Sequence, residues 1–378
     1  MNRLVIIGNG FDIAHGLKTS YKDFINWYWE QIIDGFTGNT TRVLEDYLCK
    51  LSINENSKLN SWYEFAFTNS HFRDIQGNRK YSGNDIIEYI KSDSATFNIE
   101  YSAFLGTIIQ SIETKGWVDI ENDYYQLLKN CIKNPNCGYT VDELNKQLFF
   151  LQNKLVDYLN TISTNVNIED LKKAIIVFFN PNDFSTEGRN KAQDDIGLNL
   201  AEFDGELIDN EERKKLIPKR IMLLSFNYTN TVRMYNNFNI VHNYIHGELE
   251  NPKEIIFGYG DELDKDYQDI LDKKDNELLR NAKSVKYLET RHYREMLEFI
   301  QSAPFQVFIM GHSCGNSDRT LLNTVFEHDN CVSIKPFYHK WDDGSDNYLD
   351  IVQNISRNFT NMKLFRDRVV NKEQCQTM

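Results

Sequence analysis

The stretch that decides the fold of this chain is Arg3-Leu4-Val5-Ile6-Ile7-Gly8-Asn9-Gly10-Phe11-Asp12. Its first half is almost entirely apolar, which is typical of a parallel strand that is buried on both faces. The two glycines that follow allow a tight turn and a close approach of the backbone to a phosphate. A single G-x-G pattern also occurs in ordinary strand-to-helix turns. Its position directly after the first strand is what favours a ligand site.

The same strand-to-helix pattern returns in the last third of the chain. We expect strands there at residues 221–226, 254–257, 305–310 and 332–337, separated by helical segments. Strands that alternate with helices predict an α/β fold with a Rossmann-like, doubly wound, mostly parallel sheet.

From about residue 40 to residue 217 the strand signal mostly disappears. One amphipathic helix is clear at 144–158, and the polar stretch 180–214 is expected to be an exposed connection. We therefore predict two domains. A Rossmann-like nucleotide-binding domain takes residues 1–38 and 218–378, and a large, mainly helical insertion or cap takes residues 39–217.

Composition limits the classes of function. Among 378 residues, 42 Lys and Arg oppose 55 Asp and Glu, a net charge of −13, which argues against direct binding of nucleic acid. No run approaches the roughly 20 apolar residues of a membrane span, and the first residues lack a signal-peptide pattern, so we expect no membrane association and a cytoplasmic protein. The six scattered cysteines fit a reducing compartment and have no zinc-ribbon spacing.

Unusual residues gather where the predicted strands end, and ligands of doubly wound sheets bind outside the carboxyl ends of the strands. Asn227 follows one strand, in Ser225-Phe226-Asn227-Tyr228, and His246 precedes Gly247 after another strand-like run. A neutral imidazole at such a position is a suitable general base. The structural alternatives are that Asn227 caps a helix and that His246 is a core residue.

A third group of polar residues is Gly311-His312-Ser313-Cys314-Gly315, followed by Asp318. It fits the G-x-S-x-G pattern of a hydrolase nucleophile elbow. Only residues 314–378 remain after it to supply an acid and then a histidine, which argues against that fold. The same small polar loop can instead accept a ribose or phosphate. Asp318 is expected to cap the helix that follows.

Together these groups resemble the AbiH family of bacterial abortive-infection proteins. The family's opening is matched by Gly8-Asn9-Gly10-Phe11-Asp12 with Gly16, Leu17, Thr19, Tyr21 and Phe24. An internal W-x-x-x-E element is matched at 117–121, and the S-F-N-Y-T, I-H-G and G-H-S-x-x-x-x-D groups begin at Ser225, Ile245 and Gly311. The resemblance implies a role in defence against phage.

The order of these groups also resembles, more distantly, the sirtuin-like NAD-binding fold. That resemblance implies NAD(+) as substrate or ligand, with Asn227 and His246 acting on the nicotinamide ribose. The four-cysteine zinc module of deacetylating sirtuins is absent, so protein deacetylation is not expected and no metal is predicted. The residues expected to bind the cofactor are Gly8, Asn9, Gly10, Asp12, Thr19, Tyr21, Ser225, Tyr228, Gly247, Gly311, Ser313 and Asp318.

Three hypotheses follow. The first is a phage-defence enzyme that cleaves NAD(+) with His246 and Asn227 as catalytic residues. The second is a non-catalytic module that senses a nucleotide or a phage component, and the third is a serine hydrolase that uses Ser313. The phage trigger and any homo-oligomer stay open at this point.

Overall fold

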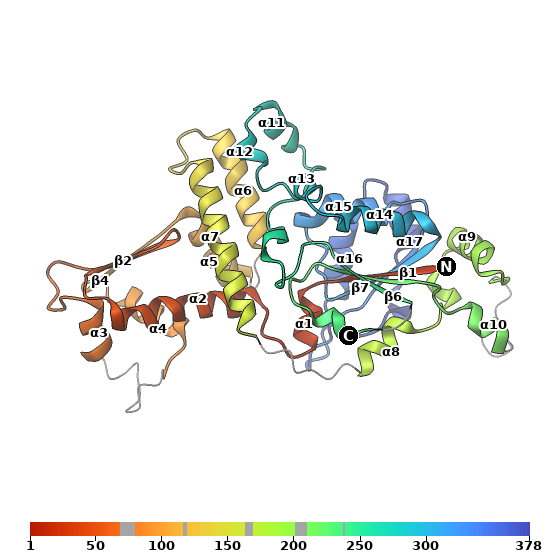
Figure 1. The fold of residues 1–378 in the computed structure, drawn as a ribbon, viewed down its shortest axis with the longest axis horizontal. Coiled ribbons are helices and arrows are strands. Elements are labelled where there is room, and N and C mark those ends of the chain that lie inside the picture. The colour runs from red at the N-terminus through yellow and green to blue at the C-terminus, as the bar shows by residue number, and fades with distance from the viewer. Residues whose placement is uncertain (69–79, 116–118, 163–168, 201–209, 237–238) are drawn as a thin grey trace. The chain divides into compact units, whose positions relative to one another are not determined.

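The computed structural model describes residues 1–68, 80–115, 119–162, 169–200, 210–236 and 239–378 (Figure 1). They form two compact units. The first comprises Met1–Lys18, Ile162–Asp275 and Leu279–Met378, and the second comprises Thr19–Thr161 and Asn276–Leu278. Trp117 of the W-x-x-x-E element lies outside the described residues.

The first unit is built on a five-stranded parallel sheet. Its strands in spatial order are β6 (Ile240–Tyr244), β5 (Ile221–Ser225), β1 (Asn2–Ile7), β7 (Phe305–Met310) and β8 (Cys331–Pro336). Numbered along the chain, this order is 3-2-1-4-5, the order of Rossmann-like sheets, so the expected α/β class is confirmed. The chain reverses its direction of winding between β1 and β7, and such a reversal is where these folds bind ligands.

Helices cover both faces of this sheet, and short 3-10 turns lie within several of the loops that connect its elements. The helices are α1 (Asn9–Ala14), α8 (Glu169–Ile176), α9 (Thr186–Ile196), α10 (Asn210–Lys215), α11 (Tyr267–Asp272), α13 (Lys283–Lys286), α14 (His292–Ser302), α15 (Arg319–Phe326), α16 (Tyr348–Arg357) and α17 (Met362–Arg368). The 3-10 turns of this unit are Pro181–Asp183, Thr231–Met234, Pro252–Glu254, Asn316–Asp318 and Lys372–Gln374.

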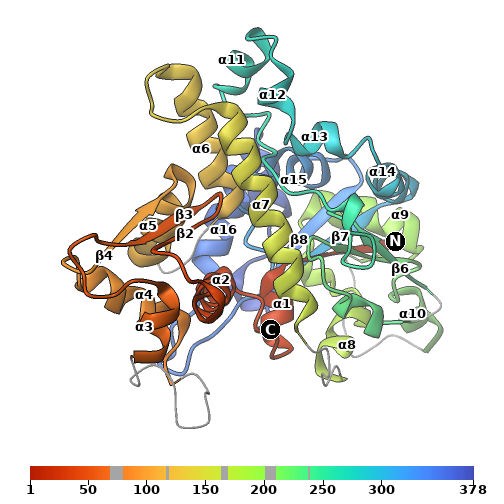
Figure 2. The same cartoon turned by 60° about the vertical axis from the view of Figure 1, so that its left-hand side comes forward.

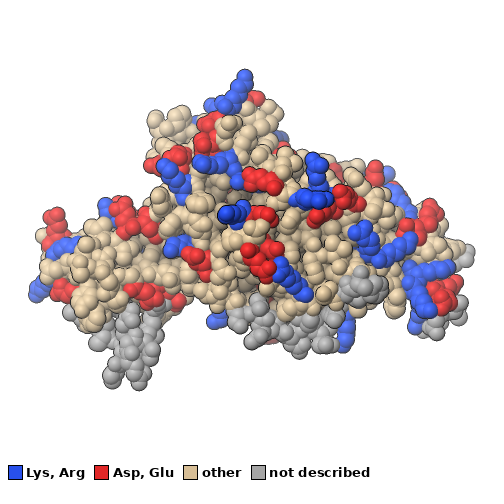
Figure 3. Space-filling view, viewed as in Figure 1, with Lys and Arg blue, Asp and Glu red and all other residues tan. Residues whose placement is uncertain are grey.

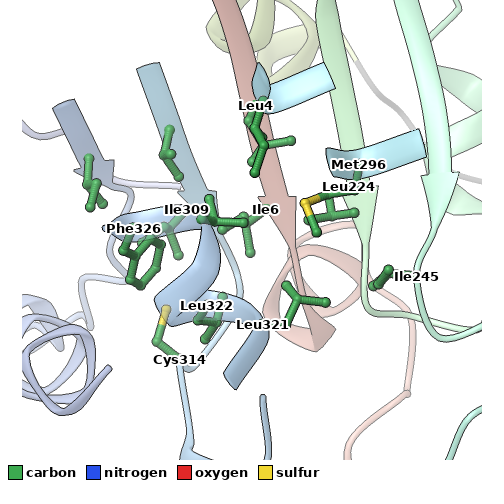
Figure 4. Packing of buried hydrophobic residues seen from close by; sticks show 14 of the residues in the cluster. Leu4, Ile6, Leu224, Ile245, Met296, Ile309, Cys314, Leu321, Leu322 and Phe326 are labelled. Carbon is green, nitrogen blue, oxygen red and sulfur yellow. The ribbon is translucent and has the colours of Figure 1, made fainter. Parts of the chain in front are cut away.

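Alternation along β1 separates two cores. Leu4 and Ile6 point to one face, where they join Met296 of α14 and Leu321 of α15 (Figure 4). Val5 and Ile7 point to the other face, where they join Phe11 of α1 and Ile175 of α8. Each fully buried aliphatic side chain contributes about 1.5–3 kcal/mol relative to an exposed one. Burial on both faces explains why the central strand is apolar from Leu4 to Ile7.

Two expectations about this unit were wrong. Residues 254–257 form no strand, because the 3-10 turn Pro252–Glu254 leads directly into irregular backbone. The stretch 180–214 is not simply an exposed connection, since α9 lies within it and buries Ala192. Its polar residue Asp183 is also buried, where it accepts a hydrogen bond from Lys335 Nζ at 3.0 Å.

The second unit combines helices with a small antiparallel sheet. The sheet consists of β2 (Val43–Glu45), β3 (Cys49–Ile53) and β4 (Phe97–Tyr101), in that order. The helices are α2 (Tyr21–Gly35), α3 (Trp62–Thr68), α4 (Gly83–Ser92), α5 (Ala103–Lys115), α6 (Ile120–Lys133) and α7 (Val141–Asn160), with a 3-10 turn at Phe36–Gly38 and most of α12 (Asn276–Leu279). Helix α2 packs against α4 and α7, and α6 packs against α5 and α7 (Figure 2).

No strand of this small sheet was predicted from the sequence, because its strands are short and alternate between buried and more exposed residues. Helix α2 begins at a side-chain cap. Ser20 accepts a hydrogen bond from the backbone N–H of Asp23 at 3.1 Å and caps the helix.

Charge is mixed over the face of the molecule in Figure 3, where Lys and Arg lie among Asp and Glu. No described helix has the length and apolar character needed to cross a bilayer.

Gly311 offers a test of the contact between the β1 and β7 loops. It has φ of +71°, and a Cβ there would lie 2.0 Å from the backbone nitrogen of Phe11. We expect Gly311→Ala to lower the free energy of unfolding by more than about 4 kcal/mol, because backbone strain and a steric clash add together. The matched control is Gly344→Ala, at φ of +87° with open space, which should cost only about 1–2 kcal/mol. Equal costs in denaturant titrations would contradict the close contact.

Candidate functional site

The loops that follow β1 and β7 touch at the reversal point of the sheet. The backbone N–H of Gly10 donates to the carbonyl oxygen of Gly311 at 2.8 Å. A Cβ at Gly10 would lie 2.8 Å from the Cα of Gly311, and one at Gly8 would lie 2.6 Å from the Cα of His312. The glycines of the G-x-G pattern are thus needed for loop-to-loop contact. The amide of Gly10 is already paired, so it does not face a phosphate in this conformation.

Asn227 ties β5 to the same loop. Its Nδ2 donates to the carbonyl oxygen of Gly8 at 3.0 Å, and its backbone N–H donates to Ser225 Oγ at 3.2 Å. Both residues are buried. Asn227 therefore lies at the carboxyl edge of the sheet. Its side-chain amide connects the end of β5 to the loop that follows β1.

A buried cluster of charged and polar side chains is centred on Asp318. Lys283 Nζ lies 2.7 Å from Asp318 Oδ1, and His246 Nε2 lies 3.2 Å from the same oxygen. His312 Nε2 lies 3.5 Å from Oδ2, and the hydroxyl of Tyr287 lies 3.2 Å from His246 Nε2. These residues come from the segment after β6, from α13 and its C-terminal neighbour, and from the β7 loop. Folding therefore joins segments that are far apart in sequence.

Asp318 stands at the N-cap position of α15, but its side chain makes no capping hydrogen bond. The expectation that its side chain caps this helix was therefore wrong. The carboxylate faces Lys283 and the two histidines instead, because a buried carboxylate needs charged or strongly donating partners.

The cluster has strongly shifted ionisation. Burial alone would raise the pKa of Asp318, but Lys283, His246 and His312 outweigh burial and hold that pKa well below its usual range. Burial, and then the neighbouring Lys283 cation, lower the pKa of His246 to about 4. Near neutral pH the cluster therefore contains an ionised Asp318 and a neutral His246.

This charge state fixes the tautomers of both histidines. An ionised carboxylate only accepts hydrogen bonds, so each Nε2 that faces Asp318 carries the proton. His312 Nδ1 accepts the backbone N–H of Cys314 at 3.0 Å. His246 Nδ1 has no hydrogen-bond partner among the residues described. Only His246 therefore keeps a ring lone pair that is free to accept a proton.

The backbone around His312 is strained and firmly held. Cys314 has φ of 54°, which is unusual for a residue other than glycine, and Asn358 Nδ2 donates to its carbonyl oxygen at 2.9 Å. The Cys314 thiol is buried, which raises its pKa and makes it inert. The same loop carries His312, whose Nε2 faces Asp318.

Ser313 lies at the surface of this loop, away from a base. Its side chain is exposed, and no histidine of the described chain contacts its hydroxyl. Its carbonyl oxygen accepts a hydrogen bond from Asn354 Nδ2 at 2.8 Å. The G-x-S-x-G pattern is therefore present without the hydrogen-bonded histidine that a serine nucleophile requires.

A second buried acid, Asp12, follows β1 in helix α1. Its Oδ2 accepts the hydroxyl of Thr229 at 2.6 Å, and its Oδ1 has no partner within the described ranges. Burial raises the pKa of Asp12, and the hydrogen bond from Thr229 opposes this shift. Asp12 and Thr229 hold the turn after β1 against the turn after β5.

The other predicted binding residues have varied positions. Tyr228 donates its hydroxyl to the carbonyl oxygen of Ile256 at 3.0 Å, and Asn9 is exposed in the first turn of α1. Gly247 has φ of +81° and packs against Glu254. Thr19 and Tyr21 belong to the second unit, at the start of α2.

Sequence reasoning did not assign a site role to Lys283, Tyr287 or His312. Lys283 and Tyr287 lie in a charged helical segment without a motif, and only their burial marks them. His312 could have been found, since it stands beside Gly311 at a strand end. No group of three or more His, Cys, Asp or Glu suited to a metal ion occurs in the part of the chain that is described.

The sheet order and this cluster define an α/β protein of Rossmann-like topology that carries a buried acid–base centre at the carboxyl ends of its strands. Residues 4–339 match the family model described as bacteriophage abortive infection AbiH, so the chain belongs to that family. This membership supports a role in anti-phage abortive infection. A search of curated proteins found no match.

The lowered pKa of His246 predicts a pH dependence of stability. The unfolded chain protonates this histidine near pH ~6.5 and the folded chain only near pH 4. The contribution of the neutral imidazole to the free energy of unfolding is therefore fully present above about pH 6.5, and it is lost as the pH falls toward 4. The loss should be on the order of 1–3 kcal/mol.

Denaturant titrations between pH 7 and 4.5 test this with wild type and His246→Gln, which cannot titrate at this position. Other groups titrate in both proteins and cancel in the difference. Parallel pH profiles for the two proteins would contradict a buried neutral His246.

Lys283→Met tests the ion pair at the centre of the cluster. Because it leaves the buried Asp318 carboxylate without its cation, we expect a loss of about 3–5 kcal/mol in the free energy of unfolding. The control is Lys286→Met, which removes a more exposed lysine 3.6 Å from Glu289 and should cost less than about 1 kcal/mol. A cost for Lys283→Met as small as that of the control would show that the pair is not buried in solution.

Proposed function

We propose that the protein takes part in abortive infection by binding NAD(+) or a related nucleotide at the carboxyl edge of its parallel sheet and hydrolysing the nicotinamide–ribose bond. The observation that supports this most is the state of His246. It is neutral, its Nε2 proton is directed to Asp318, and its Nδ1 lone pair has no partner among the described residues. The distant resemblance to the sirtuin-like fold supplies the choice of NAD(+).

In the proposed reaction His246 is the general base. As the bond between the ribose and nicotinamide breaks, positive charge develops on the ribose and nicotinamide leaves with the bonding electron pair. A water molecule attacks the ribose carbon and gives its proton to His246 Nδ1. The ionised Asp318 stabilises the imidazolium that forms, against burial and the Lys283 cation, which lower the pKa of His246 to about 4.

Other residues have supporting roles in this proposal. Lys283 and His312 keep Asp318 ionised and in position. Asn227 holds the β1 loop through Gly8 and orients the ribose or the water. Since the Gly10 amide is paired with Gly311, the proposal does not use that amide for the pyrophosphate.

His246→Gln tests the proposed base with a side chain of similar size. We expect it to fold and to lose NAD(+) hydrolysis by a factor on the order of 100 to 10,000, the usual contribution of acid–base catalysis. Ser313→Ala is the comparison variant at the same edge, and its activity should stay within about fivefold of wild type. Free nicotinamide from purified protein, cellular NAD(+) during infection and plaque counts are the measurements.

Each alternative has a distinct result. Binding of NAD(+) by wild type with no release of nicotinamide, together with normal protection against phage, would replace hydrolysis by nucleotide sensing. Complete loss of protection in a folded Ser313→Ala would favour the serine hydrolase. Wild-type protection with undiminished NAD(+) would remove NAD(+) as the substrate.

A further inference from the structure

Two cysteines of the second unit lie side by side at the junction of α6 and α7. Cys131 is in the last turn of α6, and Cys137 is in the loop that leads to α7. Their Sγ atoms are 3.6 Å apart, and both residues are partly exposed. Both thiols also point to the carbonyl oxygen of Tyr139, at 3.7 Å from Cys131 and 3.1 Å from Cys137.

The segments that carry the two thiols are held on both sides. Asn130 Nδ2 donates to the hydroxyl of Tyr139 at 2.8 Å, which links the loop to α6. On the other side Thr140 and Glu143 form a reciprocal capping box at the start of α7. Gly138, at φ of +87°, allows the turn between them. The short distance between the thiols is therefore built into the fold.

We propose that Cys131 and Cys137 are an oxidative modification site, at which a peroxide or a disulfide reagent converts the two thiols into a reversible intramolecular disulfide. The other four cysteines do not offer such a pair. Cys49, Cys314 and Cys331 are buried, and Cys375 hydrogen-bonds to Val370. The site is independent of the proposed hydrolysis of NAD(+).

With hydrogen peroxide the reaction has two steps. The Cys137 thiolate attacks one peroxide oxygen, the O–O bond breaks, and a sulfenic acid and water form. Cys131 then attacks the sulfenic sulfur through its own sulfur, the S–O bond breaks, and the hydroxide that leaves takes up a proton as water. Two thiols and one peroxide thus give one disulfide and two waters.

The order of attack follows from the environment. Burial and the neighbouring Cys137 raise the pKa of Cys131 to about 12, which disfavours its thiolate as the first nucleophile.

A soft metal ion is a less suitable occupant of this pair, because no third His, Cys, Asp or Glu joins it within the described chain.

The test uses the full-length protein, reduced and then treated with hydrogen peroxide, followed by thiol alkylation and peptide mass analysis. Wild type should acquire a Cys131–Cys137 cross-link that dithiothreitol reverses, at a rate independent of protein concentration. Cys375→Ser should behave as wild type. Cys131→Ser should form no cross-link and should retain a sulfenic acid at Cys137 that dimedone labels.

Three results would overturn the proposal. In wild type, the two thiols could oxidise separately to sulfinic acids, or either could cross-link to another cysteine. In a parallel sample with zinc chloride alone, stoichiometric protection of both thiols from alkylation would assign the pair to metal binding instead. Because these results come from wild-type protein, the proposal does not depend on how any variant folds.

Discussion

The buried carboxylate of Asp318 is the constraint on which the candidate site depends. A carboxylate removed from water needs donors or cations close to it, and here Lys283, His246 and His312 supply them. These partners come from separate segments of the chain, so satisfying one charge fixes the relative positions of all of them. It also fixes which ring nitrogen of each histidine carries the proton. The chemistry available to His246 is thus a consequence of where Asp318 lies.

A second constraint operates at the reversal point of the sheet. Gly10 and Gly311 bring two loops into backbone contact, and the hydrogen bond between them closes the space directly above β1 and β7. In Rossmann-like proteins this is where a phosphate commonly approaches the backbone. Here the tight contact and the neighbouring His246 cluster belong to the same edge. In the proposed function the nucleotide therefore meets this edge beside the glycine contact rather than through the amide of Gly10.

The sequence predicted the sheet well because β1, β5, β7 and β8 are buried on both faces, which leaves short and mostly apolar runs. It also predicted the strand ends that Asn227 and His246 follow. It could not predict that Lys283 joins them, since a lysine in a charged helical segment has the same local pattern whether exposed or buried. The small sheet β2–β4 was missed for a related reason: its short strands alternate and carry no strong apolar run.

The energetics of the cluster favour a functional origin. Removing charges from water costs several kcal/mol per ion, and apolar residues of similar volume commonly stabilise a core as well or better than a buried ion pair. Lys283 is fully buried, so its ammonium group has been removed from water. The strained backbone of Cys314 adds a further cost in the same loop. Stability alone therefore gives no reason to keep a carboxylate, a lysine and two histidines together, whereas the proton transfer proposed for His246 gives one.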